Sequence, residues 1–384
     1  MKKTIFTFTF LILMINLFSS EWNGLSSIKP EAADIQLVQS DIRSSLMKIT
    51  IPGFYLDPVE TGSGIAYIVH TENTSAILES GSPDLPKVTG SLLIPDLASM
   101  GVRIVSSSYR EYEDILIAPS KGNLTRDIDP ATVPFTYGET YQKDAFFPET
   151  LTDLRDPYII RDFRGQTIIV YPFRYNPVTK VLRVYEEISI EVFQTGNDGL
   201  NPLIRKGYPD KIDEQFGKIY DHHFLNFGNM DYTPVEEQGN MLIISYGSLM
   251  TAMQDFVNWK KTIGIPVEMV DVATIGNSSA IKSYIANYYN TNGLTFVLLV
   301  GDAAQVPTSY ASGDSDNNYS YIVGSDHYPD LFVGRFSAEN TGHVETMVQR
   351  TIEYEQNPTL GYDWYTKCIG IASSQGPGDQ VVPS

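Results

Sequence analysis

The hydrophobic period of this chain changes near residue 232, and this change limits the folds open to it. From about 22 to 230, short alternating or β-branched runs such as "QTIIVYPFRYN" and "VLRVYEEISIEVF" are separated by turn residues. Such runs predict the strands of an all-β domain, with a sandwich as the expected architecture and a turn at Asn176-Pro177. Beyond 232, apolar strands alternate with helix-like segments, so the sequence predicts two domains of different class.

The second half predicts βαβ units. The runs 241–245, "IPVEMVDV" and "TFVLLVGD" predict strands, and "LMTAMQDFVNWKKTIG" and "SSAIKSYIANYYNTNG" predict the helices between them. Ser278 or Ser279 is the expected N-cap of the second helix, and Gly293 closes it. Strand and helix alternation at this spacing favours right-handed crossovers and a parallel sheet covered on both faces. That accounts for "FVLLV" being apolar throughout.

The remaining segment predicts a hairpin and one more βα unit. "YSYIVGSDHYPDLFVGRFS" has two apolar runs around a polar loop, which is typical of a hairpin. A helix is expected to begin near Ser337, and "KCIGIASS" predicts a last strand.

Length and charge bound the function classes. With 384 residues, two domains are favoured, each able to bury its own core. The 27 basic and 46 acidic side chains give a formal net charge of −19, which repels phosphate backbones and anionic lipid heads. Nucleic acid is therefore not an expected partner, and cations are the more natural ligands of the acidic second half.

The N-terminus predicts export. Two lysines precede an apolar run from Ile5 to Phe18, as in a secretory signal peptide, here taken as residues 1–20. An N-terminal anchor or a buried strand is the alternative. The run is shorter than the roughly 20 residues of a membrane span, and no other stretch predicts a transmembrane segment. The chain has 1 cysteine, Cys368, so no internal disulfide is expected.

Three aspartates stand next to apolar runs. Asp302 follows the strand that ends at Val300, and Asp326 and Asp330 lie in the loop of the predicted hairpin. In open α/β sheets, the functional crevice lies outside the carboxyl ends of the strands, which singles out Asp302. The alternative to a functional role for Asp302 is a structural one, as an Asx-type cap or turn residue. Arg335 is a candidate partner for a carboxylate near the sheet end, and a plain surface ion pair is the equal alternative.

Several collinear motifs carry a family resemblance: "DYTPVEE", "DFVNWKKTIGI", "TFVLLVGD", "IVGSDHYPDLFVGRFS" and "QRTIEYEQN". Together they resemble the start of the catalytic domain of the gingipains, secreted bacterial cysteine endopeptidases. The upstream region is more loosely similar to the β-rich gingipain propeptide. After the predicted signal peptide over 1–20, the resemblance implies a β-rich propeptide, expected to be a sandwich, over 21–231. It also implies the N-terminal part of a caspase-like α/β peptidase domain over 232–384, incomplete at its C-terminal end.

The implied function is that of a secreted cysteine endopeptidase made as a latent precursor. Its substrates would be proteins or peptides, its own propeptide would inhibit it, and it would act outside the bacterium or at its surface. In such enzymes a histidine activates a cysteine thiolate. Both are expected beyond Ser384, so no catalytic residue is assigned and the chain alone is expected to be inactive. Cys368 lies in an apolar strand pattern, where a buried hydrophobic role is usual.

Two other function classes remain open. The first is a non-enzymatic secreted calcium-binding or adhesion protein with the same fold. The second is a flavodoxin-like nucleotide-binding module, but no Gly-rich phosphate loop follows the strand "MLIIS".

The resemblance also implies one calcium ion. Its expected ligands are the side chains of Asp302, Asp326 and Asp330 with the carbonyls of Val323 and Tyr328. Calcium takes six to eight oxygen ligands, and three unpaired carboxylates held close together would raise one another's pKa. Asp330 stands where the arginine-selective gingipains carry glutamate. The alternative is a loop of solvated turn aspartates.

Maturation is expected by a cut between Asp231 and Tyr232. The linker before "YTPVEE" is polar and predicted to be exposed. Asp231 replaces the arginine that the family carries before the cut, so cleavage by an arginine-specific site is not expected. Ser374 and Gln375 stand near the position where arginine-selective members have an acidic residue, which leaves the cleavage specificity open.

The five histidines are given structural interpretations. His222 and His223 are expected to be a solvated pair in the linker, because no cysteine or carboxylate lies near them at the spacing of metal ligands. His327 is expected to orient its loop, and His70 and His343 to be structural.

Overall fold

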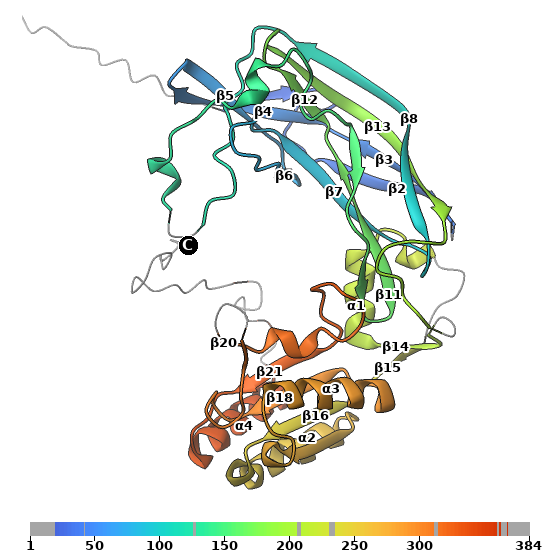
Figure 1. Ribbon diagram of the computed structural model, residues 1–384, viewed down its shortest axis with the longest axis vertical. Helices are drawn as coiled ribbons and strands as arrows, with labels where there is room; N and C mark the ends of the chain where they lie inside the picture. The colour runs from blue at the N-terminus through green and yellow to red at the C-terminus, as the bar shows by residue number, and fades with distance from the viewer. Residues whose placement is uncertain are drawn as a thin grey trace, which may run out of the picture.

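The computed structural model describes residues 20–41, 43–125, 128–205, 209–229, 235–310, 314–358, 361 and 367. Figure 1 shows a β-rich half above an α/β half, with α1, β14 and β15 between them. The predictions for the signal peptide, for Asp231 and Tyr232, and for Cys368 lie outside the described residues. Within them, no helix is long and apolar enough to cross a membrane.

The β-rich half contains three sheets, of strand order β1-β4-β5, β10-β11-β7-β6 with β9 on β11, and β12-β13-β3-β2 with β8 on β13. The strand bounds are β1 Glu21–Gly24, β2 Asp34–Ser40, β3 Ser44–Thr50, β4 Gly53–Thr61, β5 Gly64–His70, β6 Ser75–Ala76, β7 Pro86–Leu93, β8 Ser99–Tyr112, β9 Thr152–Leu154, β10 Tyr158–Ile160, β11 Phe163–Val170, β12 Phe173–Asn176 and β13 Val181–Gly196. Short 3-10 helices span Pro130–Thr132 and Glu139–Gln142. The predicted β-rich first half is confirmed.

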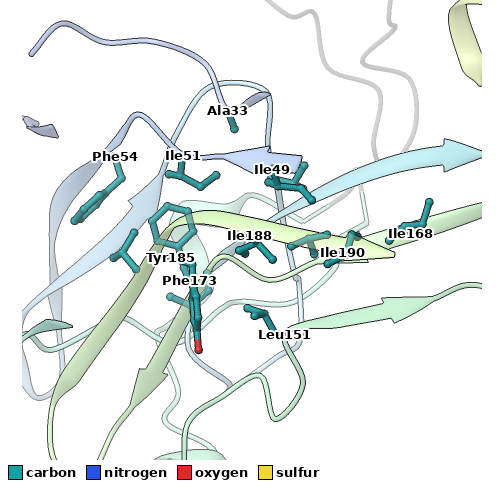
Figure 2. Packing of buried hydrophobic residues seen from close by; sticks show 14 of the residues in the cluster. Ala33, Ile49, Ile51, Phe54, Leu151, Ile168, Phe173, Tyr185, Ile188 and Ile190 are labelled. Carbon is teal, nitrogen blue, oxygen red and sulfur yellow. The ribbon is translucent and has the colours of Figure 1, made fainter. Parts of the chain in front are cut away.

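One hydrophobic core joins these sheets. Figure 2 shows Phe54 of β4 and Phe173 of β12 among the buried side chains, and their rings meet edge to face at 5.6 Å. Ile188 and Ile190 alternate with more exposed residues along β13 and are fully buried. Each such side chain contributes about 1.5 to 3 kcal/mol when removed from water. The apolar residues of the alternating pattern are therefore the ones that form the core of this half.

The predicted turn at Asn176 is present. β12 and β13 pair antiparallel, with Asn176 opposite Val181. The Asn176 side chain accepts hydrogen bonds from the backbone N–H groups of Val178 and Thr179, at 3.1 and 3.3 Å. This local bonding is the reason that asparagine favours turns.

A helix and a small parallel ladder join the two halves. Helix α1 (Glu214–His223) follows β14 (Lys211–Asp213), and β14 pairs in parallel with β15 (Val235–Glu237). A 3-10 turn, Phe227–Asn229, follows α1. The Asp213 side chain caps α1 by accepting from the N–H groups of Gln215 and Phe216. The sequence pattern predicts a linker here, and the helix is a difference found in the structure.

The α/β half contains a parallel sheet of order β17-β16-β18-β21. Its elements are β16 Met241–Ser245, α2 Gln254–Thr262, β17 Val267–Asp271, α3 Ser278–Asn292, β18 Phe296–Val300, β21 Phe332–Phe336 and α4 Thr341–Gln356, with 3-10 helices Gly247–Met253, Val272–Thr274 and η6 Asn317–Ser320 and the short pair β19 Ser309–Tyr310 and β20 Asp314–Ser315. Helices α2 and α4 border one hydrophobic cluster, and α3 borders another. The predicted parallel sheet with helices on both faces is confirmed.

Both predicted helix starts need correction. The N-cap of α3 is Asn277, whose side chain accepts from the Ala280 N–H at 3.0 Å, rather than Ser278 or Ser279. An asparagine side chain reaches the orphan donors of the first turn as well as a serine does. Gly293 closes α3 with φ +65°, as predicted.

Helix α4 begins later than predicted. It starts at Thr341 and is capped by Asn340, which accepts from the His343 N–H at 3.1 Å. Ser337, the predicted start, instead donates its hydroxyl hydrogen bond to the Asp302 carboxylate.

The predicted hairpin over residues 319–337 is wrong. β21 is the one strand in this range, and it lies parallel to β18, with Phe332 opposite Phe296 and Phe336 opposite Val300. The apolar run before it does not become a strand, because the N–H groups of Ile322 and Val323 bond to a carboxylate instead of a neighbouring strand. Residues 321–331 therefore form a loop at the N-terminal edge of the sheet.

Candidate functional site

The C-terminal edge of the sheet holds Asp302. Order β17-β16-β18-β21 makes the gap between β16 and β18 the topological switch point, where α/β sheets place their functional crevice. Asp302 Oδ1 accepts from the Ser337 hydroxyl at 2.9 Å, and this bond lowers the pKa of Asp302 below its usual value. Its carbonyl accepts from the N–H groups of Gln305 and Val306. Asp302 is thus an ionised turn-capping residue in this structure.

Arg335 ties the loops of this edge together. Its guanidinium binds Asp316 with two contacts, of 2.7 and 2.8 Å. Its remaining Nη1 donates to the carbonyls of Gly301 and Val306 at 2.8 and 2.9 Å. The predicted pairing of Arg335 with a carboxylate near the sheet end is confirmed, and the bidentate geometry fixes the turn after β18.

Asp330 lies at the opposite edge and is 0% exposed. Its Oδ2 accepts from the N–H groups of Ile322 and Val323 at 2.6 and 2.7 Å, and its Oδ1 accepts from the Arg161 N–H of the β-rich half at 2.9 Å. Burial raises the pKa of Asp330 to about 6, against the lowering effect of these donors. The carboxyl group is enclosed by backbone N–H groups from both halves of the chain.

Asp326 makes a second contact of the same kind. Its Oδ2 accepts from the Ile159 N–H at 2.8 Å and from the Asn201 side-chain amide at 2.7 Å. Its Oδ1 accepts from the Tyr328 N–H at 2.9 Å. Ile159 and Asn201 both belong to the β-rich half.

The predicted calcium ligands are not brought together. Asp302 follows β18, whereas Asp326 and Asp330 precede the parallel strand β21. Strands of five residues separate the two edges by about 16 Å at roughly 3.3 Å per residue. The described residues contain no group of three or more His, Cys, Asp or Glu side chains that could hold a metal ion.

N–H groups also fill most of the lone pairs that Asp326 and Asp330 could offer a cation. Among these donors are the N–H groups of Val323 and Tyr328, the residues whose carbonyl oxygens were expected as ligands. Calcium binds through oxygen lone pairs, and the two carboxylates have few left for it in this structure. The set of three carboxylates around one ion is corrected accordingly, and calcium binding by the protein stays a prediction.

Arg161 extends the contact at this edge. Its guanidinium Nη1 donates to the carbonyls of Leu294 and Asp330 at 2.5 and 2.9 Å. The same group lies 5.0 Å from the ring centroid of Phe216 and 5.2 Å from that of Tyr289. Arg161 therefore reaches from the β10–β11 turn to the segment just before β18.

An aromatic contact flanks the aspartates. Tyr158 stacks on Tyr328 with ring centroids 4.1 Å apart, and its hydroxyl lies 2.7 Å from His223 Nε2. Burial raises the pKa of Tyr158 to about 12, so the hydroxyl keeps its proton within this hydrogen bond with His223. The prediction of a solvated histidine pair is wrong for His223, which is half-buried at the end of α1, while His222 is exposed.

The other three histidines have structural contacts. These are a contact of 2.7 Å between His70 Nδ1 and an Asp57 carboxylate oxygen, a side-chain contact of His343 with Asn340 at the start of α4, and an edge-on ring contact of His327 with Tyr321.

Comparison with known families identifies the two halves. Residues 28–229 match the family Propeptide_C25, and residues 235–382 match Peptidase family C25. The chain therefore belongs to peptidase family C25. The β-rich half is the region that matches the C25 propeptide, and the α/β half is the region that matches the C25 peptidase.

Relatives of this C25 chain include gingipains of Porphyromonas gingivalis. It is 36% identical to Gingipain R2 over 377 residues, which are 95% of this chain and 51% of that protein. It is 26% identical to Lys-gingipain over 345 residues, 83% of this chain and 19% of that protein. The chain thus spans about half the length of the Gingipain R2 that it matches.

Among solved structures, the C25 chain is similar to the complex of Porphyromonas gingivalis RgpB pro- and mature domains. The identity is 35%, the TM-score is 0.48, and the match covers 51% of this chain and 97% of that chain. A second similar structure concerns zymogenic latency of gingipain K, with 23% identity, a TM-score of 0.41, and coverage of 46% of this chain and 100% of that chain.

Sequence reasoning missed the residues through which the propeptide contacts the peptidase half. Ile159 and Arg161 lie around a two-residue turn, with Ile160 opposite Phe163 in the β10–β11 register. Asn201 follows β13 in a loop. The one signal in the sequence is the pair of polar residues Arg161-Asp162 between apolar runs, which favours a turn but does not show what the turn binds.

Acidification is expected to weaken the His223 contact. Burial, and then the neighbouring His222, lower the pKa of His223 in the folded state. The unfolded state, with a pKa near 6.5, then binds the proton more tightly, so stability is held above about pH 6.5 and is lost as the pH falls below it. Urea unfolding midpoints compared at about pH 7.5 and about pH 5 should show this loss.

Two glutamine variants isolate the effect. His223→Gln keeps a hydrogen-bond acceptor without titrating, so its midpoint should change less with pH than that of the parent. His222→Gln alters an exposed residue and removes only the smaller cause of the lowered His223 pKa, so its midpoint should keep most of the pH dependence of the parent. An unchanged pH dependence in His223→Gln would contradict the assignment.

Proposed function

We propose that this C25 chain belongs to a secreted cysteine endopeptidase made as a latent precursor, with protein or peptide substrates. The observation that carries the proposal is the succession of a C25 propeptide match and a C25 peptidase match whose residues contact each other directly. In this proposal a signal peptide spans 1–20, the propeptide 21–231, and the caspase-like peptidase region begins at Tyr232. The protein would act outside a bacterial cell or at its surface.

The chemistry would take place at the C-terminal edge of the parallel sheet. In a cysteine peptidase, a histidine-activated thiolate attacks the peptide carbonyl, and backbone donors stabilise the oxyanion. The described residues contain no cysteine, so no thiolate is assigned here. Arg335 and Asp302 would hold the turn after β18 that borders this crevice.

The propeptide would act as an intramolecular inhibitor. Its contacts with Asp326, Asp330 and Leu294 lie at the N-terminal edge of the sheet, so it is held on the peptidase region before any cut. Cleavage between Asp231 and Tyr232 would remove the covalent link. The alternative of a non-enzymatic calcium-binding or adhesion protein receives no support from the family matches.

The proposal is tested on the secreted product of the whole reading frame. We expect no cleavage of a mixed peptide library by the precursor and thiol-sensitive cleavage once the propeptide is removed. N-terminal sequencing of the mature form should give a start near Tyr232. Cys368→Ala should retain the activity, because Cys368 is assigned no catalytic role. Cleavage that resists thiol-blocking reagents, or none after propeptide removal, would overturn the proposal.

A further inference from the structure

We propose that the loop 321–331 is a docking exosite that recognises the backbone of the propeptide turn 159–161, and that this occupancy excludes a cation from the same carboxylates. The inference deepens the latency part of the proposed function. It concerns how the propeptide is held, and its evidence is independent of any peptidase activity.

The two aspartates of the loop accept hydrogen bonds from both sides of the contact. Asp326 and Asp330 together accept six N–H hydrogen bonds: three from their own loop, by Ile322, Val323 and Tyr328, and three from the propeptide, by Ile159, Arg161 and the Asn201 side chain. Two carboxylates offer about eight lone-pair directions, so most of them are filled. Half of this bonding disappears if the propeptide leaves.

The propeptide and the loop 321–331 approach each other closely at Asn201. The Asn201 side chain donates one hydrogen bond to Asp326 and accepts one from the Ser325 N–H at 3.0 Å, so it binds the loop through both of its polar atoms. Gly324, with φ +77°, lies beneath it, and a Cβ there would come within 2.9 Å of Asn201 Oδ1 and 3.0 Å of Ile159 Cδ1. Any larger residue at 324 would push the propeptide away.

Backbone strain on the propeptide side also supports a functional contact. Arg161 has φ +47° and Asn201 has φ +48°, a region that non-glycine residues seldom occupy. Strained residues persist where the surroundings hold them, often at functional contacts. Glycine would fit the Arg161 position without strain, but it would lack the guanidinium that reaches Leu294 and Asp330.

The position of the loop makes it an exosite. Phe332 begins β21, its N–H bonds to the Thr295 carbonyl at the start of β18, and its ring meets that of Phe216 at 4.9 Å. The crevice of the switch point lies at the other end of these strands, beside Asp302. Propeptide anchoring is therefore separate from the place where substrate would bind.

The same donors exclude a cation. Calcium needs six to eight oxygens around it, whereas Asp326 and Asp330 face the positive ends of N–H dipoles. A cation entering this loop would have to displace Ile159 and Arg161 from the carboxylates. Propeptide and calcium are thus alternative occupants of one loop.

The test is amide hydrogen exchange on the full chain, read at the peptides that carry Ile159, Arg161, Ile322 and Val323. Asp326→Asn turns one acceptor into an NH₂ group facing the donors, and Arg161→Gly removes the guanidinium while relieving the positive φ. Both should speed exchange at the turn 159–161 by about tenfold, the effect of losing a hydrogen bond to a charged group. Asp302→Asn, at the opposite edge, should leave it unchanged.

Protection of β3 and β13 reports whether each variant folds, and Arg161→Gly is expected to fold because it removes strain. Unchanged protection of the turn in folded Asp326→Asn and Arg161→Gly would overturn the docking role. Calcium at millimolar concentration, the range of extracellular calcium modules, should give the loop no added protection while the turn stays docked. Added protection of both together would overturn the exclusion. A chain without peptidase activity would leave all these exchange rates as they are, so failure of the proposed function is recognised separately.

Discussion

Replacing Arg164 by methionine is expected to lower the free energy of unfolding of the propeptide half by about 3 to 5 kcal/mol. Arg164 is 1% exposed, and its guanidinium donates to four backbone carbonyls, those of Pro95, Ala98, Leu200 and Asn201, at 2.6 to 3.0 Å. Methionine fills a similar length of cavity but leaves these acceptors without donors, and each buried unsatisfied group costs about 1 to 3 kcal/mol. Urea unfolding of the full chain measures the loss.

Arg103→Met is the matched control. Arg103 lies on β8 of the same half, its side chain is 63% exposed, and it pairs with Glu191 at 2.5 Å. Exposed ion pairs contribute about 0 to 1 kcal/mol, so this variant should unfold close to the parent. Similar losses in the two variants would show that the carbonyl cluster around Arg164 does not carry the stability assigned to it.

Arg164 also connects core stability to the docking contact. It donates a hydrogen bond to the carbonyl of Asn201, and the Asn201 side chain is hydrogen-bonded to Asp326 and Ser325. Exchange at the turn 159–161 should therefore rise in Arg164→Met even under conditions in which the sheets remain folded. This coupling links a buried charge of the propeptide to the loop of the peptidase half.

The fold class could be predicted because hydrophobic period is a local property of the sequence. The alternation in β13 and the continuous apolar run of β18 each follow from how many faces of the strand are buried. Helix α1 was missed because its buried residues, Phe216, Gly217 and Tyr220, are few and lie among charged neighbours. Its N-cap, Asp213, and the acidic Glu214 in its first turn are the local signals of its start.

The candidate site could be predicted only in part, because its contacts are long-range. Proximity to apolar runs correctly marked Asp302, Asp326 and Asp330 as notable. Their partners depend on strand direction, and a hairpin would have brought all three to one edge, whereas the parallel β21 separates them. The positive φ angle of Arg161 likewise leaves no trace in residue type, whereas asparagine, present at 201, adopts such angles more often than most residues.

Asp330→Ala is expected to destabilise the chain by about 3 kcal/mol or more, although it removes a single carboxyl group. Three backbone N–H groups, from Arg161, Ile322 and Val323, would lose their acceptor at a site that is 0% exposed. Because the N–H group of Arg161 belongs to the propeptide, the loss should include weaker association of the two halves. Thermal and urea unfolding of the full chain measure the total effect.

Asp302→Ala is the control that separates the two edges of the sheet. Asp302 also stands beside an apolar strand, but its carboxylate accepts from the exposed Ser337 hydroxyl and belongs to a solvated turn. Removing an acceptor from a solvated turn leaves no buried donor unpaired, so the effect of Asp302→Ala should be small. Two aspartates that look alike in the sequence should therefore differ clearly in their effect on unfolding, and the larger effect should fall on Asp330, which shares its hydrogen bonds with the propeptide. Equal losses in the free energy of unfolding, or a larger loss for Asp302→Ala, would show that the C-terminal edge contributes at least as much to stability. Either result would contradict the assignment of Asp330 as the docking carboxylate.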